Sequence, residues 1–393
     1  MRTPIGDKRG SNQVAVREYN ERLVLQTVRT KGPSSKAQIA RYTGLTAQTV
    51  AGIIGEFEDE GLLRRGTPQK GRVGQPSIPF ELNPDGGLAI GVHVGRRSTE
   101  VILTDLMGTI LARRQDIYQH PEPHNLANFV RDCKRQFMRR QAMKNSPLIG
   151  AGVCEPSGIA GWQAKLGAPT SAIDAWQKAD FHDMLDTALG VPAVYCNDAS
   201  AACAAELLFG NSASLSNHLY VYVGSFVGGG LVINGNLFLG RTGNAAAIGS
   251  MPMGRQTREQ LIDRASLIGL EKLLMENGHQ ATTLWQDENA WRDHDVLVNA
   301  WVEQAAPALA IAVTGATALL ELDGIVIDGA FPEWVRDRLC DATRSHCAEL
   351  NQEGIPATPL YAGNLGQDAR ALGSAALPLL STFSPDHQSL LKA

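Results

Sequence analysis

An amide and a carboxylate stand side by side at Asn197 and Asp198, between an apolar run and an alanine-rich stretch. An amide next to a carboxylate can bind the hydroxyl groups of a small molecule, because together they offer hydrogen-bond donors and acceptors. Asp198 is also a good N-cap for the stretch that follows it, where it would satisfy a free backbone N–H group. The two roles can coexist, and both stay open at this point.

The cysteines and histidines supply no metal-binding motif. None of the six cysteines belongs to a CxxC or CxC pair, and four histidines are scattered without the spacing of metal ligands. In a chain of 393 residues this usage is typical of reduced, mostly buried thiols. We therefore expect no metal, no disulfide framework and no other cofactor. The residues concerned are Cys133, Cys154, Cys196, Cys203, Cys340, Cys347, His120, His124, His279 and His294.

Basic residues concentrate at the start of the chain. Residues 1–80 carry 13 Lys and Arg against 7 Asp and Glu, a net charge of +6, and the remaining 23 basic and 33 acidic residues give −10. A basic head on an acidic body is typical of a nucleic-acid-binding module joined to a second module, although charge can also divide by chance. No apolar run approaches the ~20 residues that span a bilayer, and no secretory signal opens the sequence. We expect a cytoplasmic protein without a membrane partner.

Capping and apolar residues in this head predict short helices after a first helix at 17–29. Ser35 and Gln38 have the spacing of a capping box, in which each side chain satisfies a free backbone N–H group. This helix stops before Gly44, and Thr46 caps the next one, whose apolar residues recur at the spacing of a single buried face. Two short helices joined by a turn make a helix-turn-helix, and the strand that starts after them should return as a wing.

The second helix of the pair would lie in the major groove of DNA. Gln can pair with adenine through two hydrogen bonds, and Ala can contact a thymine methyl group. Gly52 and Gly55 weaken a helix, so we expect DNA backbone or a neighbouring helix to approach them closely. A three-helix module for protein interaction is the competing interpretation. We assign to the DNA interface Ser35, Thr46, Ala47, Gln48 and Thr49.

A segment rich in glycine, proline and basic residues follows at 66–77. Arg72 in this segment could enter a narrow minor groove, where the negative potential is enhanced. A plain tether is equally compatible with the composition. We place a winged helix-turn-helix DNA-binding domain at 1–66 and a linker or wing at 67–83.

The rest of the chain repeats one pattern twice. Strand patterns punctuated by glycine are followed in each half by helical stretches and further strands. Duplicated β-β-β-α-β-α halves predict a two-lobed α/β body with a cleft between the lobes. The strands are expected at 88–95, 100–112 with a turn at Met107 and Gly108, 148–153, 191–195, 219–240 and 324–327, and helices at 126–143 and 301–320.

The order of these elements resembles the ROK family of repressors, open reading frames and sugar kinases. The strongest resemblance lies in the stretches 191–206, 224–240 and 363–375. It implies an actin-like, ribonuclease-H-like body with one lobe at 84–200, a second at 201–380 and a C-terminal tail at 381–393. The head and linker resemble the repressor branch, which includes xylose and N-acetylglucosamine regulators. Gln75 stands where the linker of this branch normally has an arginine.

The resemblance also indicates which parts of a kinase site are changed. Family kinases open their first hairpin with Asp-x-Gly-Gly-Thr, whereas this chain has His93, Arg96 and Arg97 at the Asp, second Gly and Thr. Two arginines prevent the close approach of backbone N–H groups to phosphates that glycine allows. Asn197 and Asp198 match the pair that, in the family kinases, holds the sugar and takes its proton.

Other positions of the family's sugar and zinc site differ as well. Ala247 replaces a sugar-binding Glu, Ser250 replaces a zinc-ligand His, and Phe226 occupies a normally small position of the second phosphate turn. The family's cysteine loop is missing, which leaves no set of zinc ligands. Glu155, on a turn that lines the cleft in the family, is a candidate for a compensating ligand group. The expected ligand contacts are therefore Asn197, Asp198 and Glu155.

Together these observations predict a DNA-binding transcriptional regulator, a repressor, with a degenerate kinase-like body that senses a carbohydrate or related small molecule. Operator DNA and this effector are the expected partners, and palindromic half-sites favour a homodimer or homotetramer. One alternative is an active ATP-dependent sugar kinase with an appended DNA-binding domain. Another is a regulator that binds no ligand and uses its body for oligomerisation or partner docking.

Overall fold

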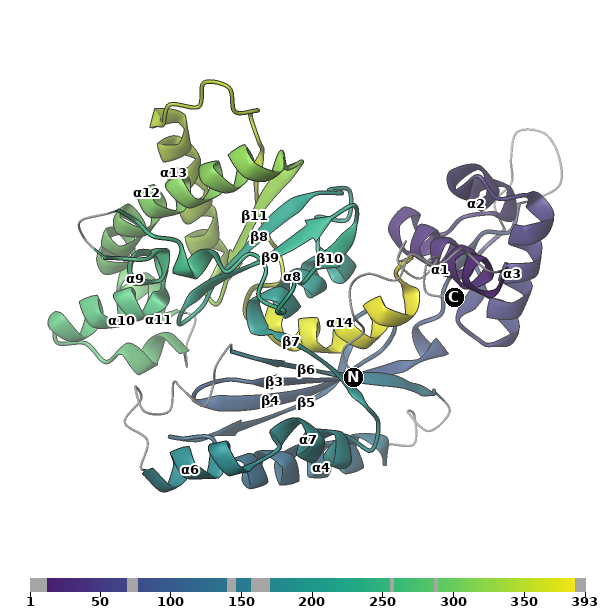
Figure 1. Ribbon diagram of the computed structural model, residues 1–393, viewed down its shortest axis with the longest axis horizontal. Helices are drawn as coiled ribbons and strands as arrows, with labels where there is room; N and C mark the ends of the chain where they lie inside the picture. Colours follow the sequence, from purple (N-terminus) through teal and green to yellow (C-terminus); the bar gives the residue numbers. More distant parts are fainter. Residues whose placement is uncertain are drawn as a thin grey trace.

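The computed structural model describes residues 13–68, 77–139, 146–156, 170–254, 258–285 and 289–385. Within these residues, a head of three helices and a small two-stranded sheet stands beside a body that contains two five-stranded sheets (Figure 1). The predicted fold class, a winged helix-turn-helix head on a two-lobed actin-like α/β body, is confirmed.

The predicted caps shape the head. Ser35 completes a capping box with Gln38, and the hydroxyl of Thr46 accepts the N–H of Thr49 at 3.1 Å. Gly44 ends a helix with a φ of 72°, in the left-handed region that glycine adopts without strain. The strand after the third helix pairs with a second strand that runs antiparallel to it. These elements are α1 (Gln13–Lys31), α2 (Lys36–Thr43), α3 (Ala47–Asp59), β1 (Leu63–Arg65) and β2 (Phe80–Leu82).

The first lobe contains a sheet with the strand order β5-β4-β3-β6-β7. Its first three strands are antiparallel, whereas β3, β6 and β7 run parallel, so the carboxyl ends of these three lie at one edge. The turn at Met107 and Gly108 divides the run 100–112 into two strands. Helices of this lobe cover the outer face of the sheet (Figure 1). The elements are β3 (Leu88–Val94), β4 (Ser98–Thr104), β5 (Ile110–Ile117), α4 (Pro123–Met138), β6 (Leu148–Glu155), α6 (Thr170–Lys178), α7 (Phe181–Leu189) and β7 (Ala193–Asn197).

The second lobe repeats this plan with the strand order β10-β9-β8-β11-β12. Its helix α12 is long and apolar enough to cross a membrane, but it is a core helix, since Trp301 and Leu309 are completely buried. The Trp301 indole N–H donates to the carbonyl of Ser266 at 3.0 Å. The elements are β8 (His218–Val223), β9 (Val227–Ile233), β10 (Asn236–Phe238), α9 (Leu261–Ala265), α10 (Leu267–Glu276), α11 (Ala290–Asp293), α12 (Asp295–Leu320), β11 (Gly324–Gly329), α13 (Glu333–Glu349) and β12 (Leu360–Ala362).

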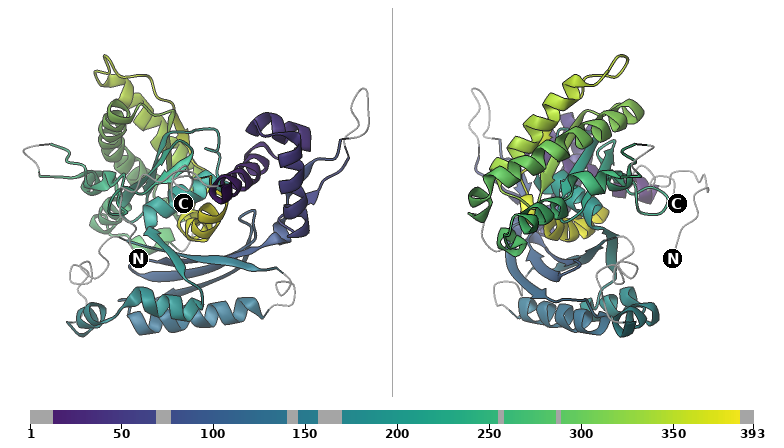
Figure 2. Two further views of the ribbon diagram at one scale, coloured as in Figure 1. Left: turned by 45° about the vertical axis from the view of Figure 1, so that its right-hand side comes forward. Right: turned by 90° about the vertical axis from the view of Figure 1, so that its left-hand side faces the viewer.

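Two helices, α8 (Asp198–Phe209) and α14 (Ala369–Phe383), pack against each other between the sheets (Figures 1 and 2). Helix α14 covers β3 and β6 of the first sheet although it follows the second lobe in sequence, whereas α8 packs on β9. Small residues permit this close packing of helix on helix and helix on sheet. A Cβ at Gly373 would overlap the carbonyl of Ala201, and a Cβ at Gly152 would overlap the carbonyl of Ser374. The two halves of the body therefore interlock, and the predicted boundaries at 200 and 380 stay predictions.

The head contacts the body at the carboxyl-terminal ends of α8 and α14. Arg29 of α1 donates from Nη1 to the carbonyls of Leu207 and Leu208, at 3.4 and 3.1 Å. Phe383, the last residue of α14, packs against the apolar core of the head. This docking is visible on the right of Figure 1, where α1 lies beside the end of α14. It gives the two central helices a direct connection to the head.

Candidate ligand site and nucleic-acid interface

The beginning of α3 presents polar and small side chains to solvent. Thr46, Ala47 and Gln48 are exposed, and the Thr49 hydroxyl lies 2.9 Å from that of Thr46. Ser35 differs from these residues because it is buried and its hydroxyl is engaged with Gln38. The assignment of all five side chains to a DNA interface stays a prediction. The predicted contact of Arg72 lies outside the described residues.

A groove of about 430 Å³ runs between α1 and α3. Gln48 and Gly52 line it from α3, and Arg17 of α1 bonds to Glu56 of α3 at 2.6 Å beside it. A Cβ at Gly52 or Gly55 would meet nothing within 4 Å, so packing against a neighbouring helix does not explain these glycines. The groove therefore leaves room at Gly52 for an approaching molecule.

Arginines on the wing side of the head have carboxylate partners. Arg64 bonds to Glu81 at 2.8 Å, and Arg65 bonds to Glu58 at 2.5 Å. Exposed ion pairs of this kind contribute little to stability. They can therefore be exchanged for contacts with phosphate groups at small cost.

The carboxyl ends of the parallel strands bring the predicted ligand residues to one edge of the first sheet. The strand register places Glu155 of β6 directly beside Asn197 of β7, and Asp198 begins α8. Side-chain oxygens of Asn197 and Asp198 each accept the N–H of Ala199 at 3.0 Å, so both residues cap α8. The other carboxylate oxygen of Asp198 lies 3.8 Å from Nη1 of Arg370. Capping therefore does not prevent Asp198 from contacting a ligand.

Glu155 is paired with a histidine that the sequence reasoning missed. Its Oε1 lies 3.0 Å from Nε2 of His182, and the His182 ring stacks on Tyr195 with 3.9 Å between the ring centres. The hydrogen bond to Glu155 raises the pKa of His182. The other carboxylate oxygen of Glu155 is buried without a hydrogen-bond partner. Glu155 thus offers one free acceptor beside Asn197.

Two arginines flank His93 at the end of β3. Arg370, from the start of α14, lies over the Tyr222 ring at 5.2 Å, and Arg96, from the turn after β3, lies over the Phe226 ring at 4.3 Å. His93 is only 6% exposed, and burial together with the charges of Arg370 and Arg96 lowers its pKa well below the ordinary value. His93 is therefore a neutral imidazole in a positively charged environment.

The glycine turns of the two lobes touch each other through these side chains. Arg96 from the first lobe stacks on Phe226 from the second, and Nη1 of Arg97 lies 3.8 Å from a carboxylate oxygen of Glu271. Glu271 is nearly buried and also accepts the indole N–H of Trp285 at 2.8 Å. These contacts hold the lobes together next to Asp198.

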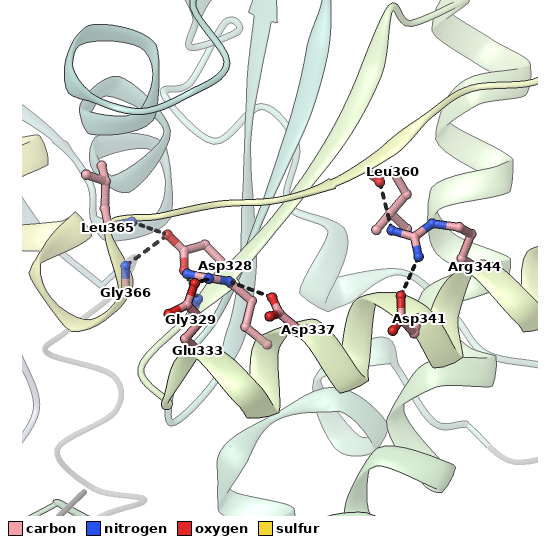
Figure 3. Close-up of polar contacts among 10 residues, drawn as sticks. Asp328, Gly329, Glu333, Asp337, Asp341, Arg344, Leu360, Leu365 and Gly366 are labelled. Atoms are coloured by element: carbon pink, nitrogen blue, oxygen red, sulfur yellow. Dashed lines mark hydrogen bonds and ion pairs between the residues drawn. The ribbon is translucent and has the colours of Figure 1, made fainter.

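A second polar cluster lies in the other lobe, around Asp328 at the end of β11 (Figure 3). Its carboxylate accepts the backbone N–H groups of Gly329, Leu365 and Gly366, at 2.9, 3.1 and 3.0 Å. A cavity of about 300 Å³ opens beside it, lined by residues that include Arg336. The hydrogen bonds of Asp328 fix the ends of the strands, so we assign it a structural role.

Two positions that correspond to a sugar ligand and a zinc ligand in the family that the sequence resembles are exposed to solvent in this protein. Ala247 and Ser250 both lie on the surface of the loop after β10. Within the described ranges no group of three His, Cys, Asp or Glu side chains could hold a metal ion. The absence of zinc stays a prediction, since other segments lie outside these ranges.

Comparisons with known proteins agree with this architecture. Residues 89–379 match the model of the ROK family. The chain is 25% identical over 365 residues to the uncharacterized protein y4fQ of Sinorhizobium fredii, covering 93% of this chain and 91% of that protein. It is 28% identical over 244 residues to the xylose repressor of Bacillus subtilis, a match that spans 61% of this chain and 62% of the repressor. A crystal structure of a ROK family transcriptional regulator, a homolog of the E. coli MLC protein, superposes with a TM-score of 0.68 at 18% identity, over 96% of this chain and all of that one.

Proposed function

Since the chain belongs to the ROK family, we propose that it is a DNA-binding transcriptional regulator, a repressor, whose body senses a carbohydrate or a related small molecule. Its homologues include xylose repressors and ROK transcriptional regulators. The observation that carries the proposal is the exposed beginning of α3, with Thr46, Ala47 and Gln48, on a head that contacts the body through α8 and α14.

Operator binding would place α3 in the major groove of DNA. The amide of Gln48 would pair with a base edge, and the free space at Gly52 would admit the DNA backbone. A homodimer or homotetramer would present two heads to the half-sites of a palindromic operator. The domain boundaries given above are part of this proposal.

The effector would bind at the start of α8. Asn197, Asp198 and Glu155 would contact its hydroxyl groups, and Arg370 would link the same site to α14. Both helices end at the head, where α8 accepts hydrogen bonds from Arg29. An effector that prefers one lobe arrangement could therefore reposition the head, and coupling of this kind is typically worth about 1–3 kcal/mol.

Operator binding is tested with DNA from upstream of the protein's own gene. We expect Gln48→Ala to weaken binding about 10- to 100-fold, since a base contact is worth about 1–3 kcal/mol. Asp198→Ala, far from α3, should bind this DNA like the wild type. Fluorescence anisotropy at fixed salt measures both variants, and equal affinities for wild type and Gln48→Ala would contradict the placement of α3.

An active sugar kinase is the competing function, and Asp198 is the observation that favours it. Such an enzyme would consume ATP in the presence of a sugar and would lose this activity on Asp198→Asn. We expect no ATP consumption, because Arg96 and Phe226 occupy the space between the two glycine turns. A regulator without an effector is the remaining alternative, and it predicts no thermal shift with any carbohydrate.

A further inference from the structure

Next to Asp198 lies a group of three basic side chains, His93, Arg96 and Arg370, which come from distant parts of the chain. His93 is the penultimate residue of β3, Arg96 belongs to the following turn, and Arg370 is on the first turn of α14. Both guanidinium groups are close enough to His93 to act on its charge. Nothing in the contacts described so far explains why the fold gathers them here.

The His93 side chain has an unmet hydrogen bond. It is 6% exposed, and its Nε2 is buried without a hydrogen-bond partner. A buried polar atom without a partner costs free energy, so such an atom in a native fold calls for an explanation. A neutral imidazole between two cations is well suited to give an N–H to an anion, which is the partner that the surrounding charge also attracts.

Arg370 shows the same deficit. Its Nε is buried without a hydrogen-bond partner, and it approaches the carboxylate of Asp198 only to 3.8 Å, beyond hydrogen-bond length. Tyr222 covers the face of its guanidinium group. Gly224 lies next to Nη1 of Arg370, and a Cβ added to Gly224 would be 3.7 Å from this nitrogen. The guanidinium edge can therefore pair with a planar or tetrahedral acid group, its preferred partner.

The charges around His93 also favour an anion as its partner. Of the nearby carboxylates, Glu100 is 3.0 Å from Arg113, and Glu155 is paired with His182. Asp198 lies 3.8 Å from Arg370, whereas the charges that act on His93, those of Arg370 and Arg96, are both positive. A neutral sugar on Asn197 and Asp198 would place no negative charge beside His93.

We infer that His93, Arg96 and Arg370 form an anion subsite, and that the effector is a carbohydrate with a phosphate or carboxylate group. Its hydroxyl groups contact Asn197 and Asp198, and its acid group accepts hydrogen bonds from the three basic side chains. This inference rests on the proposed sensing function and specifies its ligand class. It also explains the orphaned nitrogens of His93 and Arg370, because the ligand supplies their acceptors.

Calorimetric titration of the full chain tests the subsite with matched ligands. The probes are neutral aldopentoses and aldohexoses, their phosphate esters, the corresponding uronic acids, and inorganic phosphate alone. We expect at least one acidic member to bind tenfold or more tightly than its neutral parent, as charge-assisted hydrogen bonds do in proteins. Raising the ionic strength should reduce this preference, since salt screens the charges.

Three variants connect the preference to the subsite. Arg370→Gln, His93→Gln and Arg96→Gln should each reduce the ratio of acidic to neutral affinity at least tenfold. Arg97→Gln is the matched control, since it removes an equal charge from the same turn but leaves the ratio unchanged. Circular dichroism verifies that each variant is folded.

The possible failures are distinct. If a neutral sugar binds as tightly as its acidic counterpart, or if the ratio survives Arg370→Gln and Arg96→Gln, the subsite is overturned and the sensing function stands. If inorganic phosphate alone binds as tightly as the esters, the site is one for a free anion, and the inferred effector class is wrong. If no carbohydrate of either kind binds, the proposed sensing function fails together with the inference.

Discussion

At the scale of single residues, His93 gives the stability of the protein a specific pH dependence. Burial, and then the charges of Arg370 and Arg96, lower its pKa well below the ordinary value of 6.5. In the sheet, His93 lies beside Glu100 of β4 and the buried Cys154 of β6. As the pH falls, the unfolded chain binds a proton at His93 before the folded one does. Stability is therefore complete above about pH 6.5 and is lost below it, by up to about 1.4 kcal/mol per pH unit.

Denaturant unfolding at pH 7.5 and pH 5.5 measures this effect. We expect the wild type to lose more stability than His93→Gln between the two values, because the glutamine cannot take up a proton. The variant of the exposed His124, His124→Gln, should follow the wild type. An equal loss of stability in the wild type and His93→Gln would show that His93 is protonated in the folded protein.

Residues whose roles are local could be predicted from the sequence, and residues that act through tertiary contacts could not. The caps formed by Ser35 and Thr46 involve neighbours within three positions, so the sequence pattern is sufficient. Asn197 ends a strand and Asp198 opens a helix, an arrangement that the pattern also indicates. Arg370, in contrast, reaches Asp198 only because α14 returns to the first sheet, and no spacing in the sequence signals that contact.

At the scale of elements, the close packing of α8 on α14 depends on glycine. A methyl group at Gly373 would run into the backbone carbonyl of Ala201, and backbone moves less readily than the end of a side chain. We therefore expect Gly373→Ala to destabilise the protein by about 1–3 kcal/mol, the usual cost of overpacking. Thermal or denaturant unfolding measures the change.

Gly52→Ala is the matched control, because it is the same substitution in a helix with open space around it. Alanine is a better helix former than glycine, so this variant should be as stable as the wild type or gain up to about 1 kcal/mol. If DNA backbone approaches α3 at this position, the same variant should bind operator less tightly. Destabilisation by both substitutions to the same extent would contradict the packing argument.

Most elements could be predicted from periodicity, because apolar residues at strand or helix spacing identify a buried face. The helix predicted at 301–320 exists but begins earlier, at Asp295, and the strand at 191–195 is shifted to Ala193–Asn197. The position of α14 could not be predicted in the same way. Periodicity shows that a helix has an apolar face, but not which of two similar sheets that face will cover.

At the scale of the whole molecule, Arg29 connects the head to the body. Burial lowers the pKa of Arg29 to about 10, so its guanidinium group stays charged at neutral pH while it bonds to the last carbonyls of α8. Arg29→Met removes these hydrogen bonds, and bonds from a charged donor are worth about 1.5–3 kcal/mol. We expect this variant to bind operator within threefold of the wild type, and to lose at least four-fifths of the effector's influence on operator affinity.

Operator titrations with and without effector measure this coupling. Arg22→Met is the control, since Arg22 belongs to the same helix and its carboxylate neighbour Glu18, at 4.0 Å, is also on α1. The control should keep the full response to effector. A full response in Arg29→Met would show that the signal reaches the head by another route, such as Phe383 of α14.

Because α14 follows the second lobe in sequence but covers the first sheet, that sheet receives its covering helix late in protein synthesis. The ribosome completes the head and both sheets before it adds α14, so a nascent chain has a finished head with only part of its docking surface. During this interval the inner face of β3 and β6 lacks its cover, which is the kind of apolar surface that chaperones shield.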